Sequence, residues 1–164
     1  MEAKGWQLFV HQLFRDRLER LTERVEQLAV AHPGDYRSHP SAKLLATIRR
    51  YILEIIPQDP NAPEFRLGNT LGPDNRHWFR ARFHERYRLF FRFSTKSKII
   101  IYGWMNDESE LRKAGSKTDP YVKFKAMLER GDPPFSFDDL LKASRTLVHG
   151  KQKAQSTVRQ TKKK

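Results

Sequence analysis

The N-terminal third of the chain repeats apolar residues every three or four positions, which is the spacing of one helix face. This pattern runs from Leu13 to about Val30, with charged residues on the other face, and predicts an amphipathic helix. A second helix is predicted from about Ser41 to Ile56, and Pro57 ends it. Because only a short polar stretch containing HPGDY separates the two, we expect an antiparallel helical hairpin.

The middle of the chain changes to alternation with a period of two, the pattern of β-strands. Strands are predicted at Gly5–Val10, Trp78–His84, Tyr87–Phe93 and Lys98–Trp104. Short polar turns join the last three, which predicts an antiparallel meander. In the stretches WFRARF and YRLFFRF most aromatic residues share one side and the arginines the other. We therefore expect the helices to cover the aromatic face and to leave the arginine face open.

The C-terminal third is expected to hold two shorter helices, at about Tyr121–Arg130 and Phe137–Val148, after a polar loop that follows Trp104. Together the elements predict an α+β fold, in which an N-terminal strand and a two-helix hairpin pack on an antiparallel sheet and helices follow at the C-terminus. Residues 1–148 are predicted to form the domain, and residues 149–164 a disordered basic tail.

The net charge of +13 is concentrated in two segments rather than spread along the chain. Residues 76–98 hold eight Lys or Arg against one Glu, and residues 149–164 hold six Lys or Arg and no acidic residue. Elsewhere the acidic and basic residues balance. Such concentrated positive charge favours a polyanionic partner, because neutralised phosphates release their condensed counter-ions.

The predicted open face of the hairpin carries four arginines: Arg80, Arg82, Arg88 and Arg92. Neighbouring strands lie about 4.8 Å apart, so these guanidiniums repel one another unless an anion lies across them. A phosphodiester is the natural partner, since guanidinium and phosphate pair through two parallel hydrogen bonds. The alternative is a solvated face whose counter-ions are loop carboxylates at Asp107, Glu108 or Glu110.

Cleavage of RNA requires a base for the 2′-OH proton, cations for the charged phosphorane and an acid for the leaving 5′-oxygen. His84 is predicted to lie on the arginine face, with His77 just before the strand, so both are candidate bases. Tyr121, at the start of a predicted helix, is a candidate to stack on a base or to assist proton transfer. Lys113 and Lys117 are candidate phosphate contacts. Each of these residues could instead have an ordinary surface or packing role.

Other kinds of chemistry lack a signal in the sequence. The chain has no Cys, and it has no glycine-rich phosphate loop, HExxH motif, acidic metal cluster or nucleophile elbow. We therefore expect neither a metal ion nor a cofactor. No apolar run is long enough to span a bilayer and no signal peptide is recognisable. These features predict a soluble, cytoplasmic protein that does not act at a membrane.

Several stretches also match a known family. YRLFFRF, GWMNDESELRKAGSKTDPYVKFKAMLERGDPP, and KLLA followed by PEFRLGNTLG resemble the YhaV toxins. These toxins are the ribonuclease half of the PrlF–YhaV (SohA–YhaV) type II toxin–antitoxin system, within the RelE/ParE superfamily. The match runs in order from about Gly5 to Pro134.

The resemblance implies a RelE-like fold and metal-independent cleavage of mRNA, in this superfamily often on the ribosome, which inhibits translation and growth. It also implies neutralisation by a PrlF/SohA-like antitoxin of the AbrB swapped-hairpin type. The toxin–antitoxin complex is then expected to bind its own operator DNA and to repress the operon.

RelE-like enzymes use basic residues on the second strand, an arginine on the next strand, and an arginine and a tyrosine near the C-terminal end. By motif these positions fall on Arg80, Arg82, Arg88, Arg112 and Tyr121. We expect Arg88 to stabilise the transition state and Arg80 and Arg82 to position the RNA backbone, while Tyr121 stacks or moves a proton.

Further basic residues are expected to extend the RNA-binding surface: Arg86, Arg92, Arg112, Lys113 and Lys117. This chain has arginines where RelE has lysines. Because an arginine is a poor general base at neutral pH, His84 stays a candidate for that role.

Three other functions stay open at this point. The chain could bind RNA or the ribosome without cleaving, or it could regulate transcription by binding DNA alone, although it has no clear helix-turn-helix. A gyrase poison of the ParE type is the third, because a fold does not determine its target.

Overall fold

A computed structural model describes residues 1–148 of the 164-residue chain. The strands are β1 (Glu2–Ala3), β2 (Trp6–His11), β3 (Phe79–Phe83), β4 (Tyr87–Ser94), β5 (Ile99–Met105) and β6 (Ser144–Thr146). The α-helices are α1 (Gln12–Ala31), α2 (Pro40–Arg50), α3 (Ile56–Gln58), α4 (Pro120–Glu129) and α5 (Phe137–Lys142). The predicted α+β class is confirmed. The predicted disordered tail, residues 149–164, lies outside the described residues.

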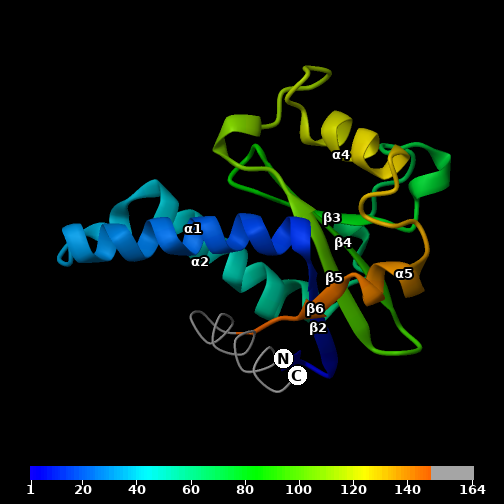
Figure 1. Cartoon of the computed structure of the whole chain (residues 1–164), viewed down its shortest axis with the longest axis horizontal. Coiled ribbons are helices and arrows are strands. Elements are labelled where there is room, and N and C mark those ends of the chain that lie inside the picture. Colours follow the sequence, from blue (N-terminus) through cyan, green and yellow to red (C-terminus); the bar gives the residue numbers. More distant parts are fainter. Residues whose placement is uncertain (149–164) are drawn as a thin grey trace, which may run out of the picture.

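The helical hairpin forms as predicted. α1 begins where the imidazole Nδ1 of His11 accepts a hydrogen bond from the Leu13 N–H at 3.2 Å. α2 begins at Pro40, and a π-helical turn at Tyr51–Ile55 carries the chain on into α3. The two long helices lie side by side and extend away from the sheet (Figure 1).

The described strands form one six-stranded sheet in the order β1-β2-β5-β4-β3, with β6 also paired to β2. The predicted meander β3–β4–β5 is antiparallel, and its register places Arg82 opposite Arg88 and Arg80 opposite Phe90. β2 pairs with β5 in parallel. A period of two identifies a strand but does not identify its neighbour, so this pairing was not predicted.

A bulge interrupts the pairing of β4 with β5. Phe90 pairs with Trp104 and Phe91 with Tyr102, which leaves Gly103 without a partner of its own. A Cβ atom at Gly103 would lie 2.6 Å from the ring of Trp78. The missing side chain therefore lets a buried tryptophan pack directly on the sheet.

Both faces of the sheet are covered, so the expectation of an open arginine face is wrong. One core lies between the sheet and the helical hairpin and includes Phe14, Ile48 and Phe91. A second core lies on the arginine face, where Phe90 stacks on Phe124 of α4 with ring centroids 4.4 Å apart. The physical reason is the sequence of β4, which places the large aromatic Phe90 among the arginines and thereby requires burial on that side too.

The predicted last helix is also corrected. α5 ends at Lys142, and Ser144–Thr146 turn into strand β6, which pairs antiparallel with β2 at Phe9 to His11. β1 pairs with the other part of the same edge, at Trp6 and Gln7. β1 and β6 are therefore strands because they pair with the backbone groups of β2, and their own local sequence does not predict them.

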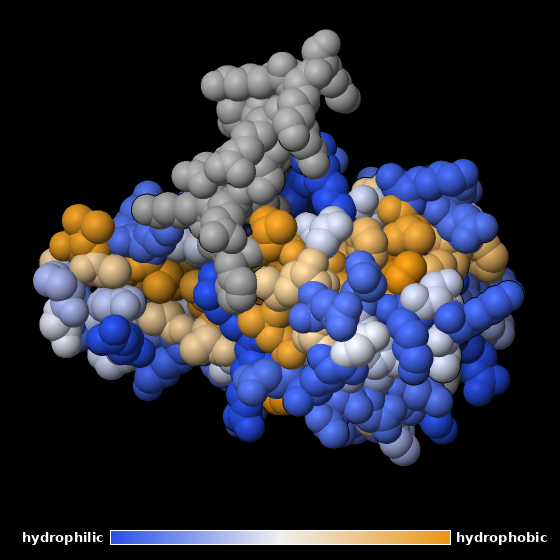
Figure 2. Space-filling model, turned by 90° about the horizontal axis from the view of Figure 1, so that it is seen from below, coloured by the Kyte–Doolittle hydropathy of each residue, from blue (hydrophilic) through white to orange (hydrophobic). Residues whose placement is uncertain are grey.

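Apolar side chains are not confined to the interior. On the lower face they form a discontinuous band bordered by polar side chains (Figure 2). The large hydrophobic residues of the described chain that are most exposed are Val30, Val122 and Phe135. Among the helices of residues 1–148, none has the length and apolar character needed to cross a membrane.

Candidate active site

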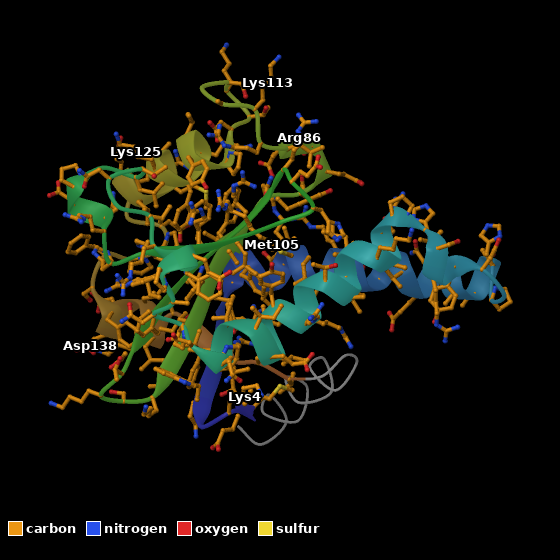
Figure 3. The ribbon with its side chains drawn as sticks, turned by 180° about the vertical axis from the view of Figure 1, so that it is seen from behind. Lys4, Arg86, Met105, Lys113, Lys125 and Asp138 are labelled. Atoms are coloured by element: carbon orange, nitrogen blue, oxygen red, sulfur yellow. The ribbon has the colours of Figure 1, made fainter. Side chains whose placement is uncertain are left out.

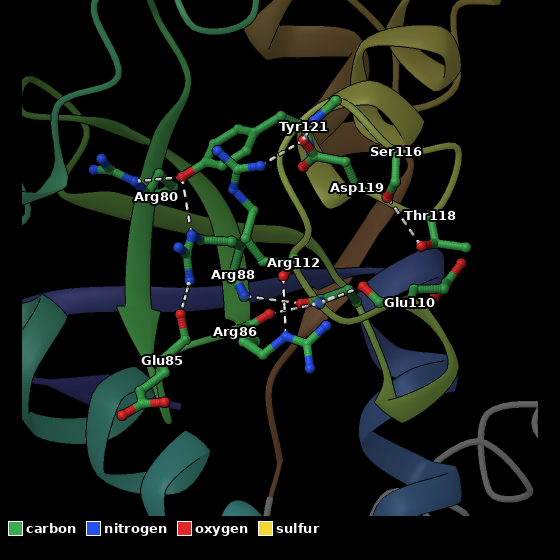
Figure 4. Close-up of polar contacts among 12 residues, drawn as sticks. Arg80, Glu85, Arg86, Arg88, Glu110, Arg112, Ser116, Thr118, Asp119 and Tyr121 are labelled. Atoms are coloured by element: carbon green, nitrogen blue, oxygen red, sulfur yellow. Dashed lines mark hydrogen bonds and ion pairs between the residues drawn. The ribbon is translucent and has the colours of Figure 1, made fainter.

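The hydroxyl of Tyr121 lies between two arginine side chains on the face of the sheet that α4 covers. It accepts a hydrogen bond from Nε of Arg80 on β3 at 2.9 Å and another from Nε of Arg88 on β4 at 3.0 Å (Figure 4). A tyrosine hydroxyl accepts two hydrogen bonds and donates one. The two guanidiniums therefore fill its acceptor positions and leave its proton for a third group.

A third arginine approaches the ring of the same tyrosine. The guanidinium carbon of Arg112 lies 5.0 Å from the Tyr121 ring centroid, and that of Arg88 lies 5.8 Å away. Both distances are in the range of cation–π attraction. We call Arg80, Arg88, Arg112 and Tyr121 the arginine–tyrosine cluster.

Asp119 fixes the orientation of this cluster. Its Oδ1 accepts from the backbone N–H of Tyr121 at 3.0 Å and so caps α4, while its Oδ2 accepts from Arg112 Nη1 at 2.6 Å. A capping aspartate followed by proline is a common helix start, and Asp119–Pro120 has that form. Asp119 was not among the residues predicted for the site, although this cap signal is present in the sequence.

Backbone carbonyls, rather than carboxylates, hold the other ends of these arginines. Nη1 of Arg88 donates to the carbonyls of Glu85 and Tyr87, both at 2.9 Å. Nη1 of Arg80 donates to the carbonyls of Glu64 and Arg66 at 3.0 and 3.3 Å. Within residues 1–148, neither arginine pairs with a carboxylate, and the Nη2 atom of each has no protein hydrogen-bond partner.

The loop carboxylates considered as counter-ions for the arginine face have other partners. Asp107 pairs with Arg17 of α1 at 2.8 Å, and Glu110 pairs with both Arg17 and Lys123. That alternative is therefore wrong for Asp107 and Glu110. Within residues 1–148, Arg112 is the one guanidinium of the cluster that pairs with a carboxylate, that of Asp119.

Arg82 and Arg92 lie on the same strands but outside the cluster. Arg82 is exposed opposite Arg88. Arg92 is half-buried, with its guanidinium carbon 5.7 Å from the Trp78 ring and 5.4 Å from the Phe137 ring. Burial lowers the pKa of Arg92 to about 10, so it stays charged at neutral pH. Its contacts indicate a packing role at the far end of the face.

His84 does not lie on the arginine face, contrary to the sequence-based expectation. β3 ends at Phe83, and His84 and Glu85 both have positive φ angles, of 45° and 62°. This turn ends the alternation and brings His84 Nε2 to 2.8 Å from Thr47 Oγ1 on α2. A left-handed turn conformation is not readable from a period-two pattern.

The second candidate base, His77, is packed rather than free. Its ring lies edge-on to Phe135 at 5.0 Å. Burial, and to a smaller extent the charge of Arg92, lowers the pKa of His77 to about 4. It is therefore neutral at physiological pH.

The remaining predicted contacts lie around the loop between β5 and α4. Arg86 is exposed and holds that loop, since its Nε donates to the Arg112 carbonyl at 3.0 Å and its own carbonyl accepts from the Arg112 N–H at 2.9 Å. Lys113 stands at the loop tip, away from the sheet (Figure 3). Lys117 is exposed farther along the same loop. In the structure Arg86 thus bonds the backbone of Arg112, and the two lysines lie exposed on the loop.

The arrangement suits chemistry on an anion. It offers two guanidinium edges, one tyrosine proton and a surrounding positive charge that carboxylates only partly neutralise. Among residues 1–148, no group of three or more His, Cys, Asp or Glu side chains could hold a metal ion.

Comparison with known proteins places the chain in a family. The family model that matches residues 8–145 is that of the YhaV toxins, described as a toxin with endonuclease activity, of a toxin–antitoxin system. Toxin YhaV of Escherichia coli O6:H1 is 45% identical over 140 residues, which are 84% of this chain and 91% of the relative. Ribonuclease toxin YhaV of Escherichia coli K12 is 44% identical over the same shares.

One solved structure gives a more distant match. The RelBE2 toxin–antitoxin complex from Mycobacterium tuberculosis aligns with a TM-score of 0.43 and 14% identity, over 63% of this chain and 99% of that chain. A likeness at this level carries no argument of its own. The family resemblance in the sequence is confirmed by the family match and by the close relatives, so this chain belongs to the YhaV toxins, which act as endonucleases in toxin–antitoxin systems.

Proposed function

We propose that this chain is an endoribonuclease that cleaves mRNA without a metal ion and thereby inhibits translation and growth. We assign this activity to the domain formed by residues 1–148. Two findings support RNA as the substrate: the close relative from Escherichia coli K12 is named a ribonuclease toxin, and the net charge of +13 favours a polyanion.

The observation that carries the proposal is the placement of the Tyr121 hydroxyl between Arg80 and Arg88. A phosphodiester beside this hydroxyl can accept hydrogen bonds from the free Nη2 groups of both arginines. Because carbonyls and a hydroxyl hold these guanidiniums, their positive charge remains available to the phosphate. Guanidiniums around a phosphate stabilise the extra negative charge of a phosphorane.

The proposed reaction is an internal transesterification. The 2′-oxygen forms a bond to phosphorus while the bond from phosphorus to the 5′-oxygen breaks, which leaves a 2′,3′-cyclic phosphate and a 5′-hydroxyl. Tyr121 donates its proton to the departing 5′-oxygen and afterwards takes a proton from solvent. The 2′-hydroxyl proton passes to solvent, since His84 lies against Thr47 rather than beside Tyr121.

The partner of the toxin is an antitoxin, because the family belongs to toxin–antitoxin systems. We further propose that this antitoxin is PrlF/SohA-like, of the AbrB swapped-hairpin type, and that the complex binds operator DNA. Encounter with mRNA on the ribosome is part of the same proposal. The sequence resemblance supports these finer assignments.

The proposal is tested with purified toxin and a 5′-labelled RNA in the presence of a chelator. We expect fragments with 2′,3′-cyclic phosphate ends from the parent chain and none from Arg88→Ala. A matched control is Arg37→Ala, because Arg37 is exposed at the tip of the helical hairpin and stacks on Tyr36. Intact RNA with the folded parent chain, despite tight RNA binding, would instead support inhibition by occupancy.

A further inference from the structure

Glu110 is a buried carboxylate outside the arginine–tyrosine cluster. Only 5% of the residue is exposed. Its carboxylate pairs with Arg17 of α1 and with Lys123 of α4, and its Oε1 accepts from the Asp107 N–H at 3.4 Å. One side chain therefore joins the helical hairpin, the loop after β5, and the helix that carries Tyr121.

The backbone of Glu110 is tied to the arginine strand through Asn106. The Asn106 amide donates to the Glu110 carbonyl at 2.8 Å and to the Arg86 carbonyl at 3.1 Å. Its oxygen accepts from the backbone N–H of Arg88 at 2.8 Å. A buried amide with all of these partners specifies one geometry, since any shift leaves a polar group unpaired.

Glu110 reaches the cluster along two short paths. On one side, Lys123 lies two residues after Tyr121 at the start of α4. On the other side, Arg112 lies two residues after Glu110 and exchanges backbone and side-chain hydrogen bonds with Arg86 (Figure 4). The Glu110 carboxylate is therefore linked to α4 through Lys123, and the Glu110 backbone is linked to β4 through Asn106.

We propose that Glu110 is a positioning residue for RNA cleavage, which acts through α4 and holds the Tyr121 hydroxyl at its distances from Arg80 and Arg88. The inference rests on the proposed function, because it assigns Glu110 a role through the Tyr121 hydroxyl. Glu110 contacts neither RNA nor the cluster itself; it acts by fixing α4, the helix that carries Tyr121.

The test is a double-mutant cycle with Glu110→Gln and Tyr121→Phe. Cleavage is measured under single turnover, and affinity is measured with an RNA that carries a 2′-deoxy sugar at the cleavage site. Because small displacements of reacting groups are costly, Glu110→Gln should slow cleavage about 10- to 100-fold. It should leave the affinity for the uncleavable RNA unchanged.

The double variant should be no slower than Tyr121→Phe alone, because the hydroxyl through which Glu110 acts is already gone. Glu108→Gln is the matched control, since Glu108 is an exposed carboxylate in the same short 3₁₀ helix, and it should cleave like the parent. If the two rate losses multiply, Glu110 acts independently of Tyr121 and the inference is overturned.

Two further results keep the inference separate from folding defects and from the proposed function. Should Glu110→Gln fail to fold, Lys123→Gln is used instead. It removes the ion pair between Lys123 and Glu110 at a half-exposed side chain, and it must show the same coupling to Tyr121→Phe. If Tyr121→Phe alone cleaves at the parental rate, the proposed function fails together with the inference. If Tyr121→Phe is slow but uncoupled from either variant, only the inference fails.

Discussion

Replacing Tyr121 with phenylalanine removes one oxygen atom and leaves the packing of the ring in place. The ring contacts Phe90 edge-on at 5.7 Å, and the residue is 8% exposed. The lost atom is the acceptor of two guanidinium hydrogen bonds. Tyr121→Phe therefore tests the hydroxyl without testing the core.

The expected effects on stability and on rate differ in size. Loss of an acceptor from buried charged donors costs about 1–3 kcal/mol of folding free energy. A domain of ordinary stability, roughly 5–15 kcal/mol, stays folded after such a loss. Loss of a general acid slows a reaction by about 100- to 10,000-fold, which corresponds to about 3–5 kcal/mol of activation free energy. The variant should consequently be folded and nearly inactive.

The assay compares single-turnover cleavage of two RNAs that differ in the leaving atom. A 5′-sulfur leaves without protonation more readily than a 5′-oxygen, because a thiol has a pKa of about 8.5. We expect Tyr121→Phe to lose activity on ordinary RNA and to recover most of it on the 5′-sulfur substrate. Tyr87→Phe is the matched control, because Tyr87 lies on the face that the helical hairpin covers and its ring stacks on Phe83.

Equal losses on the two substrates would show that Tyr121 does not donate the proton. Parental activity of Tyr121→Phe on ordinary RNA would refute the assignment of the site altogether. Circular dichroism and thermal melting of each variant establish that the chain is folded in either case.

Three further predictions concern the surroundings of the site. His84→Ala should cleave RNA at the parental rate in the same assay, because His84 contacts Thr47 rather than the cluster; a large loss would restore it as the base. Gly103→Ala should destabilise the fold by about 1–3 kcal/mol in chemical denaturation, since the new Cβ meets the Trp78 ring at 2.6 Å; unchanged stability would contradict this packing. Burial raises the pKa of Glu110, but hydrogen bonds from its two cationic partners outweigh burial and lower it from 4.5 to about 2. Its ionised form therefore stabilises the fold above about pH 4.5, and this contribution is lost as the pH falls toward 2. As the pH is lowered across this range, the melting temperature of Glu110→Gln should fall less steeply than that of the parent; equal slopes would contradict this assignment.

The elements with strong periodicity were predictable from sequence. α1 and the β3–β4–β5 meander repeat their apolar residues over several turns or alternations, so local pattern determines both the type of element and the face it buries. The β6 segment has three residues and no pattern of its own. It becomes a strand because the edge of β2 has free hydrogen-bonding groups, which is a tertiary cause.

The candidate site was predictable in part. The alternation on β3 and β4 brings Arg80 and Arg88 to one face, and the structure places Tyr121 between them. Burial of that face was not predicted, because Phe90 alternates with Arg88 and Arg92 and the face was therefore interpreted as polar. Asn106 and Glu110 bond partners far along the chain, Arg88 and Arg17. The local signal here, the capping box of Asp107 and Glu110, indicates a helix start and not these contacts.

The choice of arginine at these positions follows from what each guanidinium must do at once. Arg88 bonds two carbonyls through Nη1 and the Tyr121 hydroxyl through Nε, and Arg80 bonds the same hydroxyl and two other carbonyls. Five donors in a rigid plane allow these contacts and still leave Nη2 for a phosphate, whereas the three donors of a lysine share one nitrogen. Carbonyl and hydroxyl acceptors orient the guanidinium without cancelling its charge. Carboxylates pair with other cations, Asp119 with Arg112 and Glu110 with Arg17 and Lys123. A site built in this way keeps its cations both fixed in place and available to an anionic substrate.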